Sequence, residues 1–242
     1  EYFHKGPRRT TPYTPKIWAS CITGKKPCEH GVDSLWTYGS FLDRIGRLPV
    51  ISWVRGKRRI LWKLRLKPRV VDRRDLSSPT IFDVVKPSIA VNVMSYNTKL
   101  EYRRRVAEAF YRGREYEREI WRVFEDEKRD VLEALEKAAE WRLFMAYFDL
   151  ADWAGHLYRA RHPLKLMRAY LELDKLAGEL KRRVEDGNTI FLIVSDHGME
   201  PSEDGATGVH STRAYWSLNI DEDWEPEDFT DFYYKILEWC RN

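Results

Sequence analysis

The stretch TIFLIVSDHGME, residues 189–200, decides the fold assignment. An apolar run from Ile190 to Val194 leads directly into Asp196, His197 and Gly198. Apolar runs of this length that are rich in β-branched residues are typical of a buried strand. Ligands of open α/β sheets collect beyond the carboxyl ends of the strands. The placement of Asp196 and His197 therefore predicts a functional site at the end of this strand.

A second apolar run ends in the same way. In the stretch LFMAYFDLADWAGH, the residues 143–150 predict a fully buried strand, and Asp152 and His156 follow it four residues apart. A third imidazole, His210, follows in TGVHST. Taken singly, each acid–imidazole pair also fits an ordinary structural ion pair, and His210 fits a loop histidine. Together, at two strand ends, they predict one rim that carries two carboxylates and three imidazoles.

Oxygen and nitrogen donors of this kind suit Zn²⁺, Mn²⁺ or a similar divalent ion. Two such ions about 3.5–4 Å apart can clamp the entering and leaving oxygens of a displacement at phosphorus. Because Asp196 and His197 are adjacent in sequence, they cannot easily both serve the site of Asp152 and His156. We therefore expect two metal sites, with zinc in first place and Mn²⁺ or Mg²⁺ as alternatives.

Periodicity along the chain predicts an α/β protein with a mostly parallel central sheet covered on both faces. Long helices are expected at 100–140 and at 163–186, the latter ended by Gly187 as its C-cap. Further elements are expected as a helix at 17–23, a capped helix within 77–86, a strand at 88–96, a strand at 214–220 and a helix at 227–240. The segment 57–67 alternates like a strand or hairpin.

Composition limits the classes of function. The chain has 242 residues, enough for a single catalytic domain over 1–242, and Lys+Arg 42 against Asp+Glu 38 give a net charge of +4. This balance fits an anionic small-molecule substrate and does not indicate a nucleic acid. Three cysteines without a paired metal-binding pattern suit a reducing compartment. No apolar run is long enough to span a membrane, so we expect a cytoplasmic protein.

The N-terminal stretch TPKIWASCITGKKPCEHG makes a family resemblance specific. The chain resembles the alkaline phosphatase superfamily and, within it, the type I phosphodiesterase/nucleotide pyrophosphatase family. The matching residues are Thr14, Thr23-Gly24, Pro27, His30-Gly31, Asp152 with Gly155-His156, Ser195 to Met199, and His210. These motifs stand in the family's order between residues 10 and 219, while the region from about 40 to 140 matches only loosely.

The resemblance implies an alkaline phosphatase-like, three-layer α/β/α domain that hydrolyses phosphodiester or pyrophosphate bonds. It implies that Thr14 is the nucleophile and forms a phosphothreonine intermediate. It assigns Asp152, His156 and His210 to one metal ion, and Asp196, His197 and Thr14 to the other. Metal coordination would lower the pKa of an otherwise inert threonine hydroxyl. The substrate-binding residues remain unassigned, and the substrate is expected to be a phosphate-ester small molecule such as a nucleotide.

The chain departs from the family pattern in two places. The family's second metal takes an aspartate from an Asp-Gly step on an upstream strand, but only 13 residues precede Thr14 and none of them is Asp. We expect the protein to continue upstream of Glu1, with this strand absent from the chain as given. Nucleotide pyrophosphatases of the family also carry an Asn shortly after the His-Gly pair, where this chain has Ser34, Leu35 and Trp36.

Other readings remain open. A phosphomonoesterase or phosphonate hydrolase of the same superfamily would share the metals and differ in the pocket. A non-catalytic metal-binding relative would explain the absent aspartate. An anion or nucleic-acid binder would use the Arg-rich block 55–74 and the run Arg103, Arg104 and Arg105. The basic segment 44–75 and the helical segment 100–140 are candidate insertions. His30, His4 and His162 are expected to be structural or surface residues.

Overall fold

The computed structural model describes residues 1–5, 10–39, 68–113 and 115–241 of the chain. The strand or hairpin predicted at 57–67 lies outside the described residues, as does the basic segment from 44 to 67. The described helices are α1 (Thr14–Thr23), α2 (Pro27–His30), α6 (Ile81–Val84), α7 (Leu100–Tyr111), α8 (Tyr116–Lys137), α9 (Leu150–Tyr158), α10 (Pro163–Val184) and α11 (Asp231–Trp239). The strands are β1 (Phe3–Lys5), β2 (Thr10–Pro12), β3 (Trp36–Thr37), β4 (Arg69–Val70), β5 (Ser88–Val91), β6 (Leu143–Ala146), β7 (Leu192–Val194), β8 (Gly198–Pro201), β9 (Gly208–Ser211) and β10 (Trp216–Leu218).

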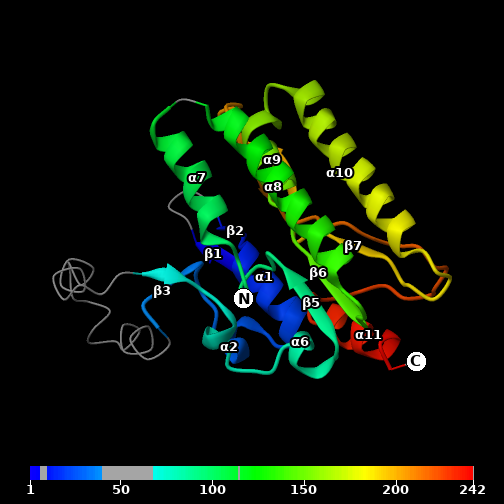
Figure 1. Cartoon of the computed structure of the whole chain (residues 1–242). Helices are drawn as coiled ribbons and strands as arrows, with labels where there is room; N and C mark the ends of the chain where they lie inside the picture. The colour runs from blue at the N-terminus through cyan, green and yellow to red at the C-terminus, as the bar shows by residue number, and fades with distance from the viewer. Residues whose placement is uncertain (6–9, 40–67, 114, 242) are drawn as a thin grey trace, which may run out of the picture.

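Helices lie on both sides of the strands β5, β6 and β7. Figure 1 shows α7, α8, α9 and α10 together on one side, and α1, α6 and α11 on the other. Each side has its own apolar core. Ala19, Ile22, Phe82 and Tyr233 belong to the core under α1, α6 and α11, and Phe124 belongs to the core that α8, α9 and α10 share. The α/β class predicted from the sequence is confirmed.

The strand pairings are smaller and more antiparallel than the sequence predicted. Among the described residues the strands form five two-stranded sheets, and β5 with β6 is the parallel pair. β7 pairs with β10 in antiparallel fashion, and the hairpin β8–β9 is antiparallel as well. The described pairings therefore do not show a large, mostly parallel central sheet. Buried apolar runs alone could not reveal the strand direction, because parallel and antiparallel strands can be equally buried.

Both strands that precede the predicted ligands are shorter than expected and less buried. β6 ends at Ala146, and all four of its residues are only partly buried. β7 covers three residues, and the side chain of Ile193 is 39% exposed. The prediction of two fully buried strands over 143–150 and 189–196 was therefore wrong in extent and burial. The chain leaves β6 early because α9 begins at Leu150.

The helical segment 100–140 is two helices rather than one. α7 ends at Tyr111 and α8 begins at Tyr116, and Gly113 between them has a φ of +63°, which a non-glycine residue adopts only with strain. α10 ends at Val184 with Glu185 as its C-cap, so the predicted cap, Gly187, lies two residues beyond the observed one, at a φ of +82°. α1 begins three residues before the helix predicted at 17–23, and the other predicted elements occur within their predicted ranges in shorter form. None of the described helices is long and apolar enough to cross a membrane.

The basic residues that the structure describes are mostly engaged in ion pairs. Arg69 binds Asp75 through both terminal nitrogens at 2.7 Å, and Arg103, Arg104 and Arg105 each pair with a carboxylate. Guanidinium groups that are already paired with carboxylates have little left to offer a polyanion. This pattern weakens the interpretation of these residues as a nucleic-acid surface.

Candidate active site

Thr14 is the first residue of α1. Pro15 occupies the first turn, where its missing N–H costs nothing and its fixed φ suits a helix start. The helix is then buried from Ile17 to Thr23, which fixes its N-terminal end against the body of the protein. The Thr14 hydroxyl oxygen lies 3.2 Å from Nε2 of His197, 183 residues later in the chain. Folding therefore brings the predicted nucleophile to one of the predicted ligands.

The helix α9 carries Asp152 and His156. The four-residue spacing puts both side chains on one face of the helix, and Oδ1 of Asp152 lies 3.3 Å from Nε2 of His156. Asp152 occupies the first turn of α9, where a negative charge interacts favourably with the helix dipole. Gly155 between them is required by packing, because a Cβ there would lie 2.5 Å from Cγ of Met199.

The hairpin β8–β9 positions the other two imidazoles. His197 directly precedes β8, and His210 lies on β9 opposite Met199. The rings of His197 and His210 stack with centroids 3.6 Å apart and an interplanar angle of 17°. Oδ1 of Asp152 lies 3.2 Å from Nε2 of His210 and 3.8 Å from Nε2 of His197. The hairpin and α9 thus bring all three imidazoles to one carboxylate.

Backbone carbonyls fix the tautomer of each imidazole. Nδ1 of His156 lies 2.9 Å from the carbonyl oxygen of Gly208, that of His210 lies 2.9 Å from the carbonyl of Pro12, and that of His197 lies 3.1 Å from the carbonyl of Gly198. A carbonyl can only accept, so each Nδ1 carries the proton. In the neutral rings, each Nε2 therefore presents a lone pair.

These lone pairs face one another and the carboxylates. Nε2 of His156 lies 3.0 Å from Nε2 of His210. Oδ1 of Asp152 and Oδ2 of Asp196 are buried and have no hydrogen-bond partner. A set of acceptors this close is favourable only when a cation or added protons lie among them. The donor types and their arrangement therefore fit a divalent cation, as does the anchoring of each imidazole by a carbonyl.

The site residues form two groups. Asp152, His156 and His210 lie within 3.3 Å of one another. Thr14 and Asp196 both approach His197, at 3.2 and 3.4 Å. A different trio, Asp152, His197 and His210, has its ligand atoms within 4.8 Å and joins the groups. The division into two groups has the shorter distances. The stacked rings of His197 and His210 explain why atoms of the two groups also lie close to one another.

Burial and charge act differently on the two carboxylates. Burial alone would raise the pKa of Asp152, but the contacts with His156 and His210 hold it well below its usual range. Burial raises the pKa of Asp196, and the charge of His197 and the contact with Thr14 only partly oppose this. Burial alone would lower the pKa of His156 and His210, yet the negatively charged Asp152 carboxylate beside them raises both. Asp152 is the more strongly anionic centre.

Comparison with known families agrees with this geometry. The family described as Type I phosphodiesterase / nucleotide pyrophosphatase matches residues 9–230. The chain belongs to this family. A phosphodiesterase/nucleotide pyrophosphatase is a phosphoric ester hydrolase, so the chain is an enzyme of that class, and the family acts on phosphate-ester small molecules such as nucleotides. No curated protein matches the chain closely enough to count as a relative.

The segment in which the family carries an Asn lies beside the predicted nucleophile. The backbone N–H of Leu35 donates to the hydroxyl of Tyr13, the residue before Thr14, at 2.9 Å. The hydroxyl of Ser34 accepts from the N–H of Trp36 at 3.2 Å. His30, the histidine of the His-Gly pair, is fully buried, lies 3.1 Å from the Ser20 hydroxyl and accepts from the N–H of Val32. Burial lowers its pKa to about 4, which fits the predicted structural role.

A buried polar network behind the site was missed by the sequence analysis. Asp149, 1% exposed, directly precedes α9, and its carboxylate accepts from Arg103 of α7 at 2.5 Å. Its N–H donates to Glu127 of α8, which is also buried and accepts from the side chain of Asn92. The network joins the start of α9 to the two preceding helices. The feature of the sequence that could have indicated this network is Asp149, between Phe148 and Leu150, but an aspartate there resembles an ordinary helix cap.

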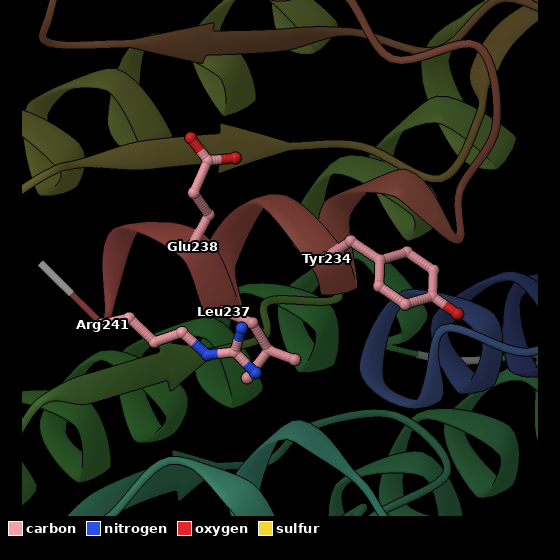
Figure 2. Close-up of a pocket in the computed structure, with 4 residues that line it drawn as sticks. All are labelled: Tyr234, Leu237, Glu238 and Arg241. Atoms are coloured by element: carbon pink, nitrogen blue, oxygen red, sulfur yellow. The ribbon is translucent and has the colours of Figure 1, made fainter.

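Surface hollows of the described structure lie elsewhere. One of about 450 Å³ is lined by Tyr234, Leu237, Glu238 and Arg241. Figure 2 shows these side chains spread along α11 rather than converging on a common point. Another of about 640 Å³ includes Trp141, Arg142 and Arg183, at the opposite end of β6 from Asp152. Neither hollow contains a residue of the site, and neither has converging polar groups typical of a binding site.

Proposed function

We propose that this enzyme hydrolyses phosphodiester or pyrophosphate bonds with two divalent metal ions and a phosphothreonine intermediate on Thr14. The observation that carries the proposal is the meeting of Thr14, two carboxylates and three imidazoles from four separate segments at distances of 3.0 to 3.8 Å. The family match supports the reaction class. Zinc suits the mixture of imidazole and carboxylate donors best.

The two groups of residues define which side chains would hold which ion. Asp152, His156 and His210 would hold one ion, and Asp196, His197 and Thr14 the other. The ions would supply positive charge to polarise the phosphoryl oxygens and to lower the pKa of the Thr14 hydroxyl. The burial of Asp196 makes it a poor lone anion, so we infer that its charge is stabilised only when positive charge faces it.

The remaining chemistry belongs to residues of the chain. The Thr14 oxygen bonds to phosphorus as the bond between phosphorus and the leaving oxygen breaks. Water then attacks the same phosphorus, breaks its bond to the Thr14 oxygen and restores the hydroxyl. The start of α1 directs the hydroxyl toward His197 and Asp196, so that little reorientation is needed. The carbonyls of Gly208, Pro12 and Gly198 keep the imidazole lone pairs directed into the site.

The proposal includes the alkaline phosphatase-like, three-layer α/β/α arrangement, with β5 and β6 as part of a mostly parallel central sheet. Its support is the parallel pairing of β5 with β6, the helices on both sides of these strands and the family match. A single catalytic domain over residues 1–242 is part of the same proposal.

A phosphomonoesterase is the second candidate. The observation that favours it is the segment Ser34-Leu35-Trp36, which lies beside Tyr13 and lacks the amide side chain that the family resemblance implies there. An amide donor at this place would help to hold a phosphoryl oxygen during transfer. Because the described loop lacks this amide, a comparison of hydrolysis rates for a phosphodiester and a phosphomonoester distinguishes the two candidates.

Thr14→Ala tests the proposal directly. We expect hydrolysis of bis(p-nitrophenyl) phosphate to fall on the order of 10³-fold or more, because the proposed nucleophile is the Thr14 hydroxyl that contacts His197. Metal content, measured by elemental analysis, should stay near the wild-type value. Thr14→Ser is the matched control, since it keeps the hydroxyl and should retain most activity. Full activity in Thr14→Ala would remove the threonine from the mechanism.

A further inference from the structure

Arg159 continues the functional face of α9. Asp152, His156 and Arg159 are spaced by four and three residues, the spacing that places side chains in one row on a helix. Arg159 keeps helical backbone angles at the end of α9 and is exposed. It lies about 4.5 Å beyond His156 along the helix axis, given a rise of about 1.5 Å per residue. Its side chain therefore starts one turn away from the predicted metal ligands.

The hairpin that carries His210 holds the base of the Arg159 guanidinium. Nε of Arg159 donates to the carbonyl of Met199 at 3.1 Å, and Met199 lies opposite His210 in the hairpin. Cβ of Arg159 packs so tightly against Gly208 that a Cβ on Gly208 would lie 2.9 Å from it. The carbonyl of Gly208 in turn anchors His156. The guanidinium is therefore held in place by its inner nitrogen, and its outer two nitrogens keep four N–H donors.

Among the described residues, no acid balances the charge of Arg159. In the part of the chain that the structure describes, no carboxylate lies within ion-pair distance of it, and Met199 O is its hydrogen-bond partner. Arg103 and Arg105 bind carboxylates at 2.5 to 2.8 Å. An arginine held at its Nε with free terminal nitrogens is suited to a bidentate contact with a phosphoryl group.

The charges of both Arg159 and Asp152 act on the phenol of Tyr170, which belongs to α10. Burial raises the pKa of the Tyr170 phenol, the charge of Arg159 lowers it, and the charge of Asp152 raises it. The phenol is thus close to both the site carboxylate and the guanidinium. Helices α9 and α10 run beside each other in Figure 1. Their facing surfaces therefore form one wall next to the site.

We propose that Arg159 is a specificity-determining residue that binds a second phosphoryl group of the substrate, next to the one that is attacked. The inference rests on the function proposed above. If Arg159 binds a second phosphoryl group, a nucleoside triphosphate that releases pyrophosphate is a better substrate than a diester with an uncharged leaving group.

The test compares two substrates with the same nucleoside and the same scissile phosphorus. Thymidine triphosphate releases pyrophosphate, whereas the p-nitrophenyl ester of thymidine monophosphate releases a leaving group without a phosphoryl group. We expect Arg159→Gln to lower kcat/KM roughly 10- to 100-fold for the triphosphate, mainly through KM, and less than about threefold for the ester. Arg159→Lys should recover part of the loss, because it keeps the charge without the fork.

Arg161→Gln is the matched control. Arg161 is also exposed and also donates its Nε to a carbonyl of the same region, that of Gly205, at 2.9 Å, but it lies beyond the end of α9. It should leave both substrates within about twofold of wild type. Equal losses on both substrates in Arg159→Gln would make the residue merely structural and would overturn the proposal, as would no loss on either.

A binding measurement separates this inference from the proposed function. Inorganic pyrophosphate is titrated into each protein by calorimetry, without turnover. Weaker binding to Arg159→Gln, roughly tenfold or more, but not to Arg161→Gln supports the subsite even if neither thymidine compound is hydrolysed, a result that would overturn only the proposed hydrolysis. Unchanged pyrophosphate binding in Arg159→Gln overturns the subsite even if the wild-type protein hydrolyses both compounds.

Discussion

Asp149 and Asp152 stand three residues apart at the start of α9 and have opposite surroundings. Asp152 faces three imidazoles, and the contacts with His156 and His210 hold its pKa well below the usual range in spite of burial. Asp149 faces Arg103 and Glu127, and burial raises its pKa to about 6 although Arg103 opposes the shift. One turn of helix separates a strongly anionic carboxylate in the site from a carboxylate that is costly to ionise.

The difference shows how the protein divides two tasks between neighbouring acids. Asp149 ties α9 to α7 and α8, through Arg103 and Glu127. The burial of Glu127 and the charge of Asp149 raise the pKa of the Glu127 carboxyl well above the usual range. Asp152 takes no part in these contacts between helices, and its carboxylate faces the imidazoles. We infer that the network around Asp149 contributes mainly to stability, and the group around Asp152 mainly to metal binding.

The largest effect that follows from this comparison is on activity. Asp152→Asn should lower phosphodiester hydrolysis on the order of 10²–10³-fold or more and should reduce bound metal, because an amide is a much weaker ligand than a carboxylate. Activity assays and elemental analysis measure both effects. Asp149→Asn is the comparison variant, with metal content expected near wild type. Equal metal loss in both variants would contradict the division of tasks.

The next effect is on stability. Arg103→Met leaves Asp149 buried without its partner, and breaking a buried ion pair costs about 3–5 kcal/mol of unfolding free energy. Urea denaturation measures this cost. The neighbouring Arg104 pairs with Glu108 at 3.7 Å on the surface, so Arg104→Met should cost less than about 1 kcal/mol. A similar cost in both variants would mean that burial of the Asp149 pair is energetically unimportant.

The smallest effect is a pH dependence. The raised pKa of Asp149, about 6, means that the native state holds a proton that the unfolded chain releases nearer pH 4. The stability from this group is complete below about pH 4 and is lost as the pH rises through about 6, by up to about 3 kcal/mol. The wild type should therefore gain stability relative to Asp149→Asn as the pH falls from 7 to 4, by up to about 3 kcal/mol. Parallel pH curves for the two proteins would remove Asp149 as the cause.

Much of the site was predictable from local sequence. Asp152 and His156 follow an apolar run and share a helix face through their spacing, and Asp196 and His197 follow another such run. These are properties of neighbouring residues, which short-range geometry controls. Thr14 was predicted through the family resemblance and lies at the start of α1 beside His197. Its role as nucleophile stays a prediction, as do the assignment of ligands to two metals and a cytoplasmic location.

The network of Asp149, Arg103 and Glu127 was not predictable in this way. Arg103 stood in a run of three arginines that was considered as an anion-binding surface, and the structure buries its pair with Asp149 while Arg104 stays at the surface. Which of three adjacent arginines turns inward depends on how α7 packs against α8 and α9. A helix periodicity gives the candidate faces but not the partner that each face meets.

The sequence by itself determined the α/β class, the order of helices and strands, and the residue types able to hold a cation, because these follow from periodicity and side-chain chemistry. The tertiary structure alone decided the strand directions, the break between α7 and α8, and the distances of 3.0 to 3.8 Å that join Thr14, Asp152 and the three imidazoles. Contacts within the site between residues up to 198 positions apart arise only when the packed cores fix where each helix and hairpin ends.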